Sequence, residues 1–352
     1  MPLASSKVFF LLSLGLFLFI LQPLPASAGQ AGGKPDPVGE EVSFCAGNVG
    51  FGPLNLSSQS PFQSLRLALV PRTPDTLSKG EWEIRFTETF ANIWSFEPNR
   101  YTLDYESADS NLAVAYGVGT NIMLELAIDD RRVFGGILDN FISGFHQLFG
   151  ISQNDRDLFP NGRTIIDIRD KNGAPLVEWR GGHAAYSQGV AFTVQNNVSC
   201  GGNGNPAFSW AVTLRYTDWD AIPIKYDFPL DIGLSLAMAK RFGPIYAYLA
   251  PGVVYYGADS VGAVELRRLQ MSALLGLEWR ATEKFSVIAQ YLLLEGACKD
   301  LEPFSEPSHE VTLGIKTLIG KKTLVEAGLL ENLIVYGNSP DFGIHLGVSH
   351  RF

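Results

Sequence analysis

The chain has 352 residues, of which 46% are hydrophobic and only 18% are charged, whereas about 25% of a typical soluble domain is charged. Its 36 acidic and 27 basic residues give a formal net charge of −9, which argues against nucleic-acid binding because phosphate recognition requires a basic surface. The 36 glycines and 23 phenylalanines suit a chain of many strands joined by tight turns.

Residues 1–28 have the three parts of a signal peptide. Lys7 supplies a positive charge, residues 8–21 form an apolar run, and residues 26–28 form a small-residue cleavage site. The apolar run is too short for a membrane-spanning helix, which needs about 20 residues. We therefore expect the protein to be exported.

Residues 29–79 are rich in Gly and Pro and show no regular hydrophobic period. They predict an N-terminal tail that is far too short for a folded plug domain but that can enter the lumen of a barrel. Cys45 lies in this tail, and Cys200 and Cys298 follow far along the chain. Three scattered cysteines allow one disulfide at most, and the sequence leaves open which two would form it.

Residues 80–352 are dominated by alternation between apolar and polar side chains. Alternation indicates a strand because successive side chains of a strand point to opposite faces. In the first part of this region the pattern predicts strands over 81–94, 101–118 and 121–130.

Residues 131–187 form a long insertion between two predicted strands. The apolar residues of 136–149 gather on one side of a helix, which predicts a surface helix with one apolar face. A hairpin signal follows, because residues 170–173 read Asp-Lys-Asn-Gly between two apolar segments. The alternation of connections places this insertion on the external side of a barrel.

The predicted helix carries one weak candidate for catalysis. Asp139, Ser143 and His146 share a helix face and supply the acid, hydroxyl and imidazole of a nucleophilic triad. Neighbouring side chains on one helix rarely align as a triad, because they lean in the same direction. The preferred interpretation is a solvated polar face, so the enzyme hypothesis is the less favoured one.

A second weak candidate follows the helix. Asn154, Asp155 and Asp157 offer the oxygen ligands that a hard cation such as calcium prefers. The interleaved Arg156 and the lack of the distal Glu of a calcium loop favour a solvated loop instead. No phosphate-binding glycine loop and no zinc-spaced Cys/His cluster occurs, so no cofactor is expected.

Beyond the insertion the alternating pattern continues to the last residue and predicts nine more strands. Together with the first three they give about 12 strands, and a count of 10 to 14 is compatible with the less regular first half. The nine predicted strands cover 183–196, 207–217, 229–241, 244–256, 268–280, 284–295, 309–319, 323–336 and 342–352.

The predicted strands have the length and chemistry of a transmembrane barrel. Strands of a soluble sandwich average about 5–6 residues, whereas a tilted strand needs about 9–11 residues to cross a bilayer. One face of each strand is apolar and often ends in an aromatic residue, and the other face is small and polar, as in a barrel with aromatic girdles. Short connections near 117–121, 241–244, 281–284 and 320–322 alternate with longer ones near 218–228, 257–267 and 296–308.

The polar faces of these strands predict which charged residues line the lumen. We expect their side chains to set any selectivity that the pore has. The predicted lumen-facing residues are Arg215, Glu278, Arg280, Glu310, Lys316, His345 and Arg351.

The last strand resembles the C-terminal assembly signal of bacterial outer-membrane barrels. That signal is an alternating strand with a glycine and a terminal aromatic residue, which Gly347 and Phe352 match. The resemblance implies the barrel assembly machinery as a partner and outer-membrane lipid as the surroundings of the barrel.

The mature chain also resembles an uncharacterised family of proteobacterial envelope proteins that is defined as a domain of unknown function. The resemblance rests on the run GGILDNFISGFH at 135–146, on Asn-Asp-Arg-Asp at 154–157, and on the regions 59–61 and 339–342. It implies a barrel and no established chemistry.

The sequence therefore predicts an all-β transmembrane antiparallel barrel in the bacterial outer membrane. A channel, a passive transporter or a structural envelope protein for an unknown small solute or lipid is the leading hypothesis. An outer-membrane lipid-modifying hydrolase and a secreted soluble β-sandwich are the alternatives.

Overall fold

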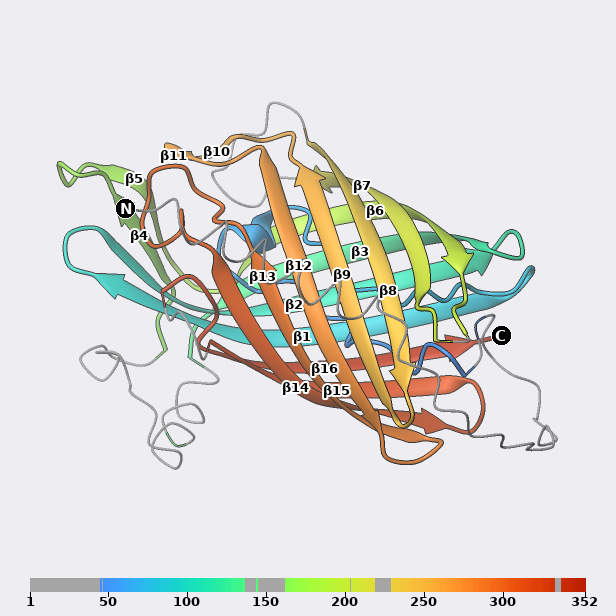
Figure 1. The fold of residues 1–352 in the computed structure, drawn as a ribbon. Coiled ribbons are helices and arrows are strands. Elements are labelled where there is room, and N and C mark those ends of the chain that lie inside the picture. The colour runs from blue at the N-terminus through green and yellow to red at the C-terminus, as the bar shows by residue number, and fades with distance from the viewer. Residues whose placement is uncertain are drawn as a thin grey trace, which may run out of the picture.

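The computed structural model describes residues 45, 47–136, 144, 162–202, 204–218, 229–332 and 337–352. Twelve strands of this described chain form an antiparallel barrel (Figure 1). They are β1 (Trp82–Glu97), β2 (Tyr101–Gly117), β3 (Ile122–Phe134), β6 (Ala184–Ser199), β7 (Ala207–Asp218), β8 (Leu230–Phe242), β9 (Ile245–Tyr255), β12 (Leu269–Arg280), β13 (Phe285–Leu294), β14 (Ser308–Ile319), β15 (Thr323–Glu331) and β16 (Phe342–Arg351).

The barrel is closed because its first strand pairs on both sides. Phe86 of β1 lies opposite Leu112 of β2 and also opposite Val348 of β16. Every other barrel strand pairs with its neighbours along the chain. This closure confirms the predicted barrel of about 12 strands and rules out the two-sheet sandwich.

The outer face of the barrel is a belt of exposed apolar side chains. Leu234 of β8, Leu313 of β14 and Leu346 of β16 are each close to half exposed or more, which suits contact with lipid. Large aromatic side chains are exposed toward both ends of the belt: Trp82, Phe242, Trp279 and Phe352 at one end, and Tyr216 and Tyr255 at the other.

The two ends of the barrel differ in the length of their connections. We call the end with the turns 118–121, 243–244, 281–284 and 320–322 the short-turn end, and the opposite end the long-loop end. The β1–β2 turn at 98–100 is an exception, because it is tight yet lies at the long-loop end. There β1 and β2 are long enough to extend as a hairpin, and β2 pairs along this extension with a further strand.

That further strand belongs to a hairpin within the insertion. β4 (Ile165–Arg169) pairs with β2 and with β5 (Pro175–Arg180). The carboxylate of Asp170 accepts hydrogen bonds from the backbone N–H groups of Asn172 and Ala174, both at 2.8 Å, which closes the predicted turn. The predicted helix at 136–149 lies outside the described residues apart from Gly136 and Gly144.

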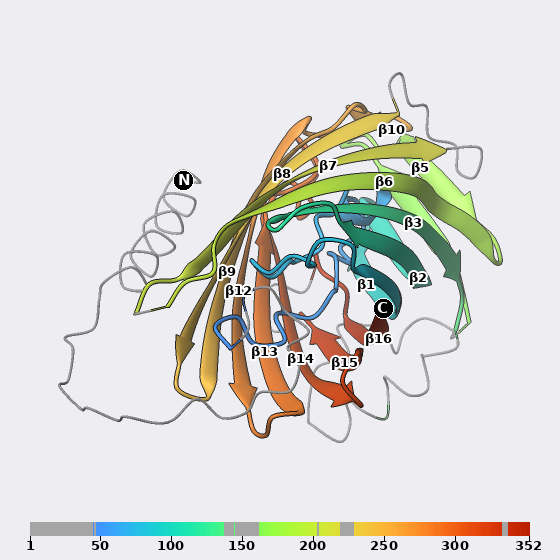
Figure 2. The same ribbon diagram turned by 90° about the vertical axis from the view of Figure 1, so that its right-hand side faces the viewer.

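A segment before β1 occupies the interior of the barrel. We call Cys45 and residues 47–79 the inner segment. It passes from the short-turn end toward the long-loop end, turns at the 3-10 helix η1 (Gln63–Leu65), and returns to the start of β1 (Figures 1 and 2). The small strands β10 (Ser260–Val261) and β11 (Val264–Glu265) lie in the loop before β12. Among the residues that the structure describes, no helix has the length and apolar composition needed to cross a bilayer.

Candidate functional site

A disulfide fixes the inner segment at the short-turn end. Cys45 is bonded to Cys200, which follows β6, with their Cα atoms 4.9 Å apart. The backbone N–H of Cys45 donates to Asp75 at 3.0 Å, and Asn197 Nδ2 donates to the carbonyl of Pro74 at 2.8 Å. The beginning and the end of the segment are therefore held together beside one turn.

The remaining cysteine has no part in this anchor. Cys298 is free and buried in the loop between β13 and β14. Burial in apolar surroundings raises the pKa of its thiol well above the usual range. The side chain belongs to a buried apolar cluster with Leu301 and Phe304, so it contributes to packing.

Carboxylates of the wall hold the limb that leads from Cys45 to η1. Glu278 of β12 accepts hydrogen bonds from the backbone N–H groups of Phe51 and Gly52. Glu310 of β14 accepts two more from residues 59 and 60, both at 3.2 Å. The limb has no strand partner, so these carboxyl groups satisfy donors that would otherwise be buried unpaired.

A third carboxylate, Glu326 of β15, is the centre of a buried charge cluster. It accepts the backbone N–H of Asn55 at 3.0 Å and lies 2.8 Å from Lys316 Nζ and 3.0 Å from His345 Nε2. Lys316 also donates to the carbonyl of Pro53 at 2.7 Å. The cluster therefore joins β14, β15 and β16 to the same limb.

The limb that returns from η1 contacts the opposite part of the wall. The guanidinium of Arg66 stacks on the Tyr256 ring at 3.7 Å, and the backbone N–H of Leu67 donates to Asp231 of β8 at 2.9 Å. Further along, Arg72 forms an ion pair with Glu125 of β3 at 2.5 Å. Arg85 of β1 pairs with the same carboxylate at 2.7 Å.

Glycines of the wall give the inner segment room to approach. A Cβ atom on Gly314 or Gly328 would lie 2.6 or 2.8 Å from Leu54 Cδ1. A Cβ atom on Gly233 or Gly252 would meet the Leu69 side chain at 2.7 or 2.5 Å. The two leucines therefore occupy notches that exist only because these wall positions lack side chains.

A polar cavity remains between the inner segment and the wall of β1, β2, β3, β6 and β7. The empty space there is about 870 Å³ when the open solvent at its mouth is included. Its charged lining residues are Arg66, Arg72, Arg85, Arg131, Arg215, Asp109, Glu125 and Asp129.

An apolar cavity of about 590 Å³, also counted to its mouth, lies at the long-loop end. Phe62 of the inner segment, Tyr105 of β2, Ile168 of β4 and Trp179 of β5 line it. The Tyr186 hydroxyl donates to the carbonyl of Pro61 at 3.0 Å. These residues belong to the largest apolar cluster of the described chain, which holds η1 beneath the hairpin.

The structure places five of the seven predicted lumen residues inside the barrel and the other two at its short-turn end. Arg215, Glu278, Glu310, Lys316 and His345 are buried, and each has polar partners inside the barrel. The two others lie at the short-turn end: Arg280 packs over the Phe51 ring at 4.3 Å, and Arg351 pairs with Glu83 at 2.8 Å.

The residues of the predicted assembly signal also have structural neighbours. A Cβ atom on Gly347 would lie 2.7 Å from Glu326 Cγ, so this glycine leaves room for the buried carboxylate. The backbone N–H of Phe352 donates to the carbonyl of Trp82 at 2.9 Å, which joins the last residue to β1.

The weak catalytic and metal candidates of the insertion lie outside the described residues. This applies to Asp139, Ser143 and His146 and to Asn154, Asp155 and Asp157. Within the described part of the chain no group of three or more His, Cys, Asp or Glu side chains is placed to hold a metal ion.

Sequence reasoning missed several residues of the lumen. Asp109 and Asp129 lie on predicted strands of the less regular first half, but they are not among the predicted lumen residues. Arg131 falls in the predicted insertion 131–187, whereas in the structure β3 continues through it to Phe134. A signal was present: in β2 and β3 these residues occupy every second position together with Asn111, Ala113 and Ala127. The contacts of Arg66 and Arg72 had no such signal, because the tail shows no period.

A closed barrel with an apolar outside and a polar, charged inside is the architecture of outer-membrane β-barrels. The fold is similar to that of the COG4313 outer membrane channel from Pseudomonas putida F1, with a TM-score of 0.51 and 12% identity over 81% of this chain and 100% of that one. The P. putida toluene transporter TodX matches with a TM-score of 0.38 and 10% identity over 78% and 90% of the two chains. The Ralstonia pickettii toluene transporter TbuX matches with a TM-score of 0.41 and 10% identity over 85% and 100%.

No curated protein matches the chain in sequence. Residues 41–352 match the family described as Protein of unknown function (DUF3187). The chain therefore belongs to this family, which is consistent with the resemblance to an uncharacterised barrel family.

Proposed function

We propose that the protein is exported through its residues 1–28 to the bacterial outer membrane and acts there as a narrow channel. The observation that carries this proposal is the polar cavity beside the inner segment. A barrel that serves only as a membrane anchor has no need of a charged cavity along its wall, whereas a channel needs a wet path past any obstruction.

The inner segment would set the width of this path. It occupies the middle of the lumen and is held by wall carboxylates, the disulfide and two leucine notches. A solute must therefore pass between the segment and the wall of β1 to β7, where the polar cavity lies. This arrangement favours small polar solutes and excludes large ones.

A barrel in the outer membrane has lipid around it and one end that faces the periplasm. The apolar belt would contact outer-membrane lipid, and the terminal strand β16 would be recognised by the barrel assembly machinery. Short turns of such barrels face the periplasm and long loops face outward, so the disulfide would lie at the periplasmic mouth.

Single-channel recording in planar bilayers tests the proposal. We expect the wild-type protein to show a small conductance, and the variant that lacks residues 29–79 to show a conductance several times larger, because the lumen is then open. Heat-dependent gel mobility of both proteins in detergent serves as the control for a folded barrel.

Equal conductance of the two folded proteins, or no conductance from either, would show that the inner segment does not restrict a pore. A milder variant, Gly328→Val, covers the case in which the deletion prevents assembly, because its new Cβ would lie 2.8 Å from Leu54 Cδ1 and no closer than 3.5 Å to a backbone atom of the wall. It leaves the chain complete and places a side chain where Leu54 now packs. We expect its conductance to rise as well, by less than in the variant that lacks residues 29–79.

A further inference from the structure

The inner segment divides the charges of the lumen into two groups. On the side of β12, β14 and β15 the buried carboxylates Glu278, Glu310 and Glu326 hold its backbone, with Lys316 as a buried cation in contact with one of them. On the side of β1, β2, β3, β6 and β7 the polar cavity is lined by five arginines and three carboxylates. The space that is open to a solute therefore has an excess of two positive charges.

Each carboxylate of the cavity already has a cationic partner. Glu125 pairs with Arg72 and Arg85. Asp129 accepts hydrogen bonds from both Nε, at 3.0 Å, and Nη2, at 2.5 Å, of Arg215. Asp109 forms an ion pair with the fourth arginine, Arg131. Each carboxylate of the lining is therefore paired with at least one arginine.

A further carboxylate lies just beyond the lining residues. Asp231 of β8 interacts electrostatically with Arg66 and Arg215, and its oxygens accept the backbone N–H groups of Leu67 and Gly257. With Asp231 included, five arginines face four carboxylates. A fifth carboxylate, Glu83, lies 3.5 Å from Arg85 and is shared with Arg351 at the short-turn end, so the lining itself is positive and the carboxylates beyond it reduce this excess.

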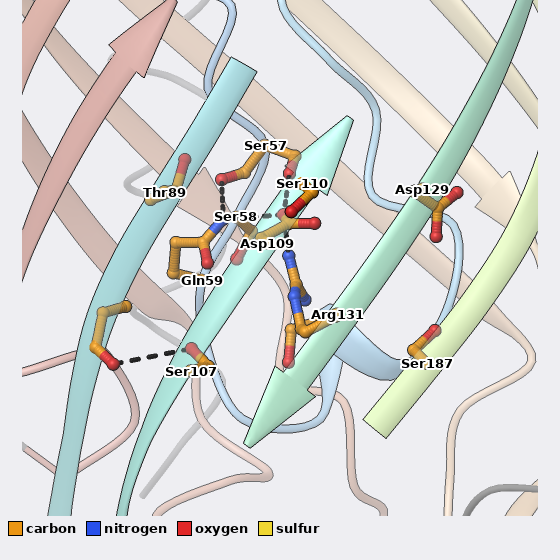
Figure 3. Close-up of polar contacts among 12 residues, drawn as sticks. Ser57, Ser58, Gln59, Thr89, Ser107, Asp109, Ser110, Asp129, Arg131 and Ser187 are labelled. Carbon is orange, nitrogen blue, oxygen red and sulfur yellow. Dashed lines mark hydrogen bonds and ion pairs between the residues drawn. The ribbon is translucent and has the colours of Figure 1, made fainter. Parts of the chain in front are cut away.

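Arg131 lines this cavity and has donors that no other described group uses. Its side chain is only 5% exposed, and Nη2 contacts Asp109. Asp109 Oδ2 in turn accepts hydrogen bonds from Ser57 Oγ at 3.4 Å and Gln59 Nε2 at 3.2 Å, so one oxygen is shared among three groups (Figure 3). Nε and Nη1 of Arg131 are buried and have no hydrogen-bond partner among the described residues.

A buried guanidinium with unpaired N–H groups needs an acceptor, because leaving such groups unsatisfied is costly. Water can accept the hydrogen bonds but leaves the excess positive charge. An oxyanion accepts the hydrogen bonds and also balances the positive charge. It suits a guanidinium particularly well, because its oxygens match the planar array of N–H groups.

We propose that the polar cavity is a pathway for small oxyanions, carboxylates or inorganic phosphate, with the unpaired N–H groups of Arg131 as the binding contact. This inference rests on the proposed channel function and names the class of solute. The neighbouring arginines 72, 85 and 215 stay paired and keep the path positive, so that an anion moves along the cavity without meeting a trapping cluster of free cations.

Reversal potentials in a KCl gradient test the selectivity. We expect the wild-type channel to prefer chloride over potassium, and Arg131→Gln to reduce that preference by about 2-fold or more, because charge in a narrow pore acts at short range. Arg132→Gln is the matched control, since Arg132 is the next residue of β3, points to the other face, and pairs with Asp130 outside the lumen. A wild-type channel that prefers potassium, or equal effects of the two variants, would overturn the inference.

A double variant separates the contact from the net charge. Asp109→Asn with Arg131→Gln removes one charge of each sign, so the net charge of the cavity is unchanged and neither partner of this ion pair is left as an unpaired charge. We expect chloride selectivity to persist, whereas inhibition of the chloride current by acetate or phosphate is lost. Persistent inhibition in this variant would show that Arg131 is not the binding contact.

A stability measurement distinguishes failure of this inference from failure of the channel proposal. At matched ionic strength, phosphate or acetate should raise the melting temperature of the folded wild-type barrel relative to chloride, because a ligand that binds only the folded state stabilises it. The rise should vanish in Arg131→Gln and remain in Arg132→Gln. If the anions stabilise the wild-type barrel in this way but the protein shows no conductance, the oxyanion site is supported and the channel proposal is wrong. If the anions do not stabilise it, the oxyanion site is wrong even when the protein conducts.

Comparing the two anions identifies the solute class more closely. Stabilisation by phosphate alone would assign a phosphate-type solute, and stabilisation by both would assign a general oxyanion path that includes carboxylates.

Discussion

Glycines on the inner face of the wall decide how closely the inner segment can approach. Gly233 and Gly252 border the Leu69 side chain, and Gly314 and Gly328 border that of Leu54. In each pair the two glycines come from neighbouring strands, so a notch needs two separate residues to lack a Cβ. Packing at these positions is specific, because interiors have little free volume.

Gly233→Val tests the notch at single-residue resolution. The new Cβ would lie 2.7 Å from Leu69 Cδ2 and 3.1 Å from Leu67 Cδ2, and no backbone atom lies among its nearest contacts. We expect the variant to keep its barrel but to release the returning limb, so that trypsin cleaves after Arg66 and Arg72, which the wild-type lumen protects.

Gly276→Ala is the control, because its Cβ would meet the wall residue Tyr248 at an ordinary 3.4 Å and no atom of the inner segment. Mass spectrometry of the digested, folded proteins identifies the cut sites. Equal protection of both variants would mean that the notch does not hold the segment.

At the scale of elements, the strands could be predicted from sequence and the course of the inner segment could not. A strand such as β12 has a period that comes from its own residues, because one face meets lipid and the other the lumen. The hairpin turn at 170–173 is likewise local, since its hydrogen bonds span only a few residues.

The inner segment depends on partners that are remote in sequence. The hydrogen bond from Gly52 to Glu278 spans 226 residues, and that from Asn55 to Glu326 spans 271. Because its backbone bonds go to side chains and not to a neighbouring strand, no period of 2 or 3.6 appears in it. For the same reason the partners of lumen residues such as Lys316 could not be predicted, although its face could.

The disulfide is a second covalent link between this segment and the barrel, besides the chain that runs on into β1. It closes a loop over a sequence separation of 155 residues, and disulfides typically contribute about 2–4 kcal/mol. We expect Cys45→Ser and Cys200→Ser to lower the stability of the folded barrel by an amount of this order, measured by denaturant unfolding in detergent.

The control for this prediction is Cys298→Ser, which removes a thiol but no link. Non-reducing gels should show faster migration of the unfolded wild-type and Cys298→Ser chains, and slower migration of the other two. If Cys45→Ser and Cys200→Ser are both as stable as the wild type, the noncovalent contacts alone hold the segment.

For the whole molecule, closure of the barrel depends on its last strand. β16 completes the sheet on two sides, because ten of its residues pair with β1 and nine pair with β15. Phe352 follows directly: its N–H donates to Trp82, its ring lies 4.8 Å from that of His350, and more than half of its surface is exposed at the short-turn end. An exposed aromatic at that position suits the membrane interface and is free for recognition by another protein.

Phe352→Asp should therefore leave export intact but reduce the amount of folded barrel in the outer membrane. A carboxylate removes the aromatic contact and places a charge at the membrane interface, whereas Phe352→Trp keeps an amphipathic ring and should assemble normally. Quantifying the heat-modifiable protein in outer-membrane fractions measures the effect, and periplasmic accumulation of the Asp variant separates failed insertion from failed export. Both variants keep the backbone N–H of residue 352 and its hydrogen bond to Trp82. Equal outer-membrane levels of the two variants would therefore show that the terminal side chain is dispensable for recognition and for closure.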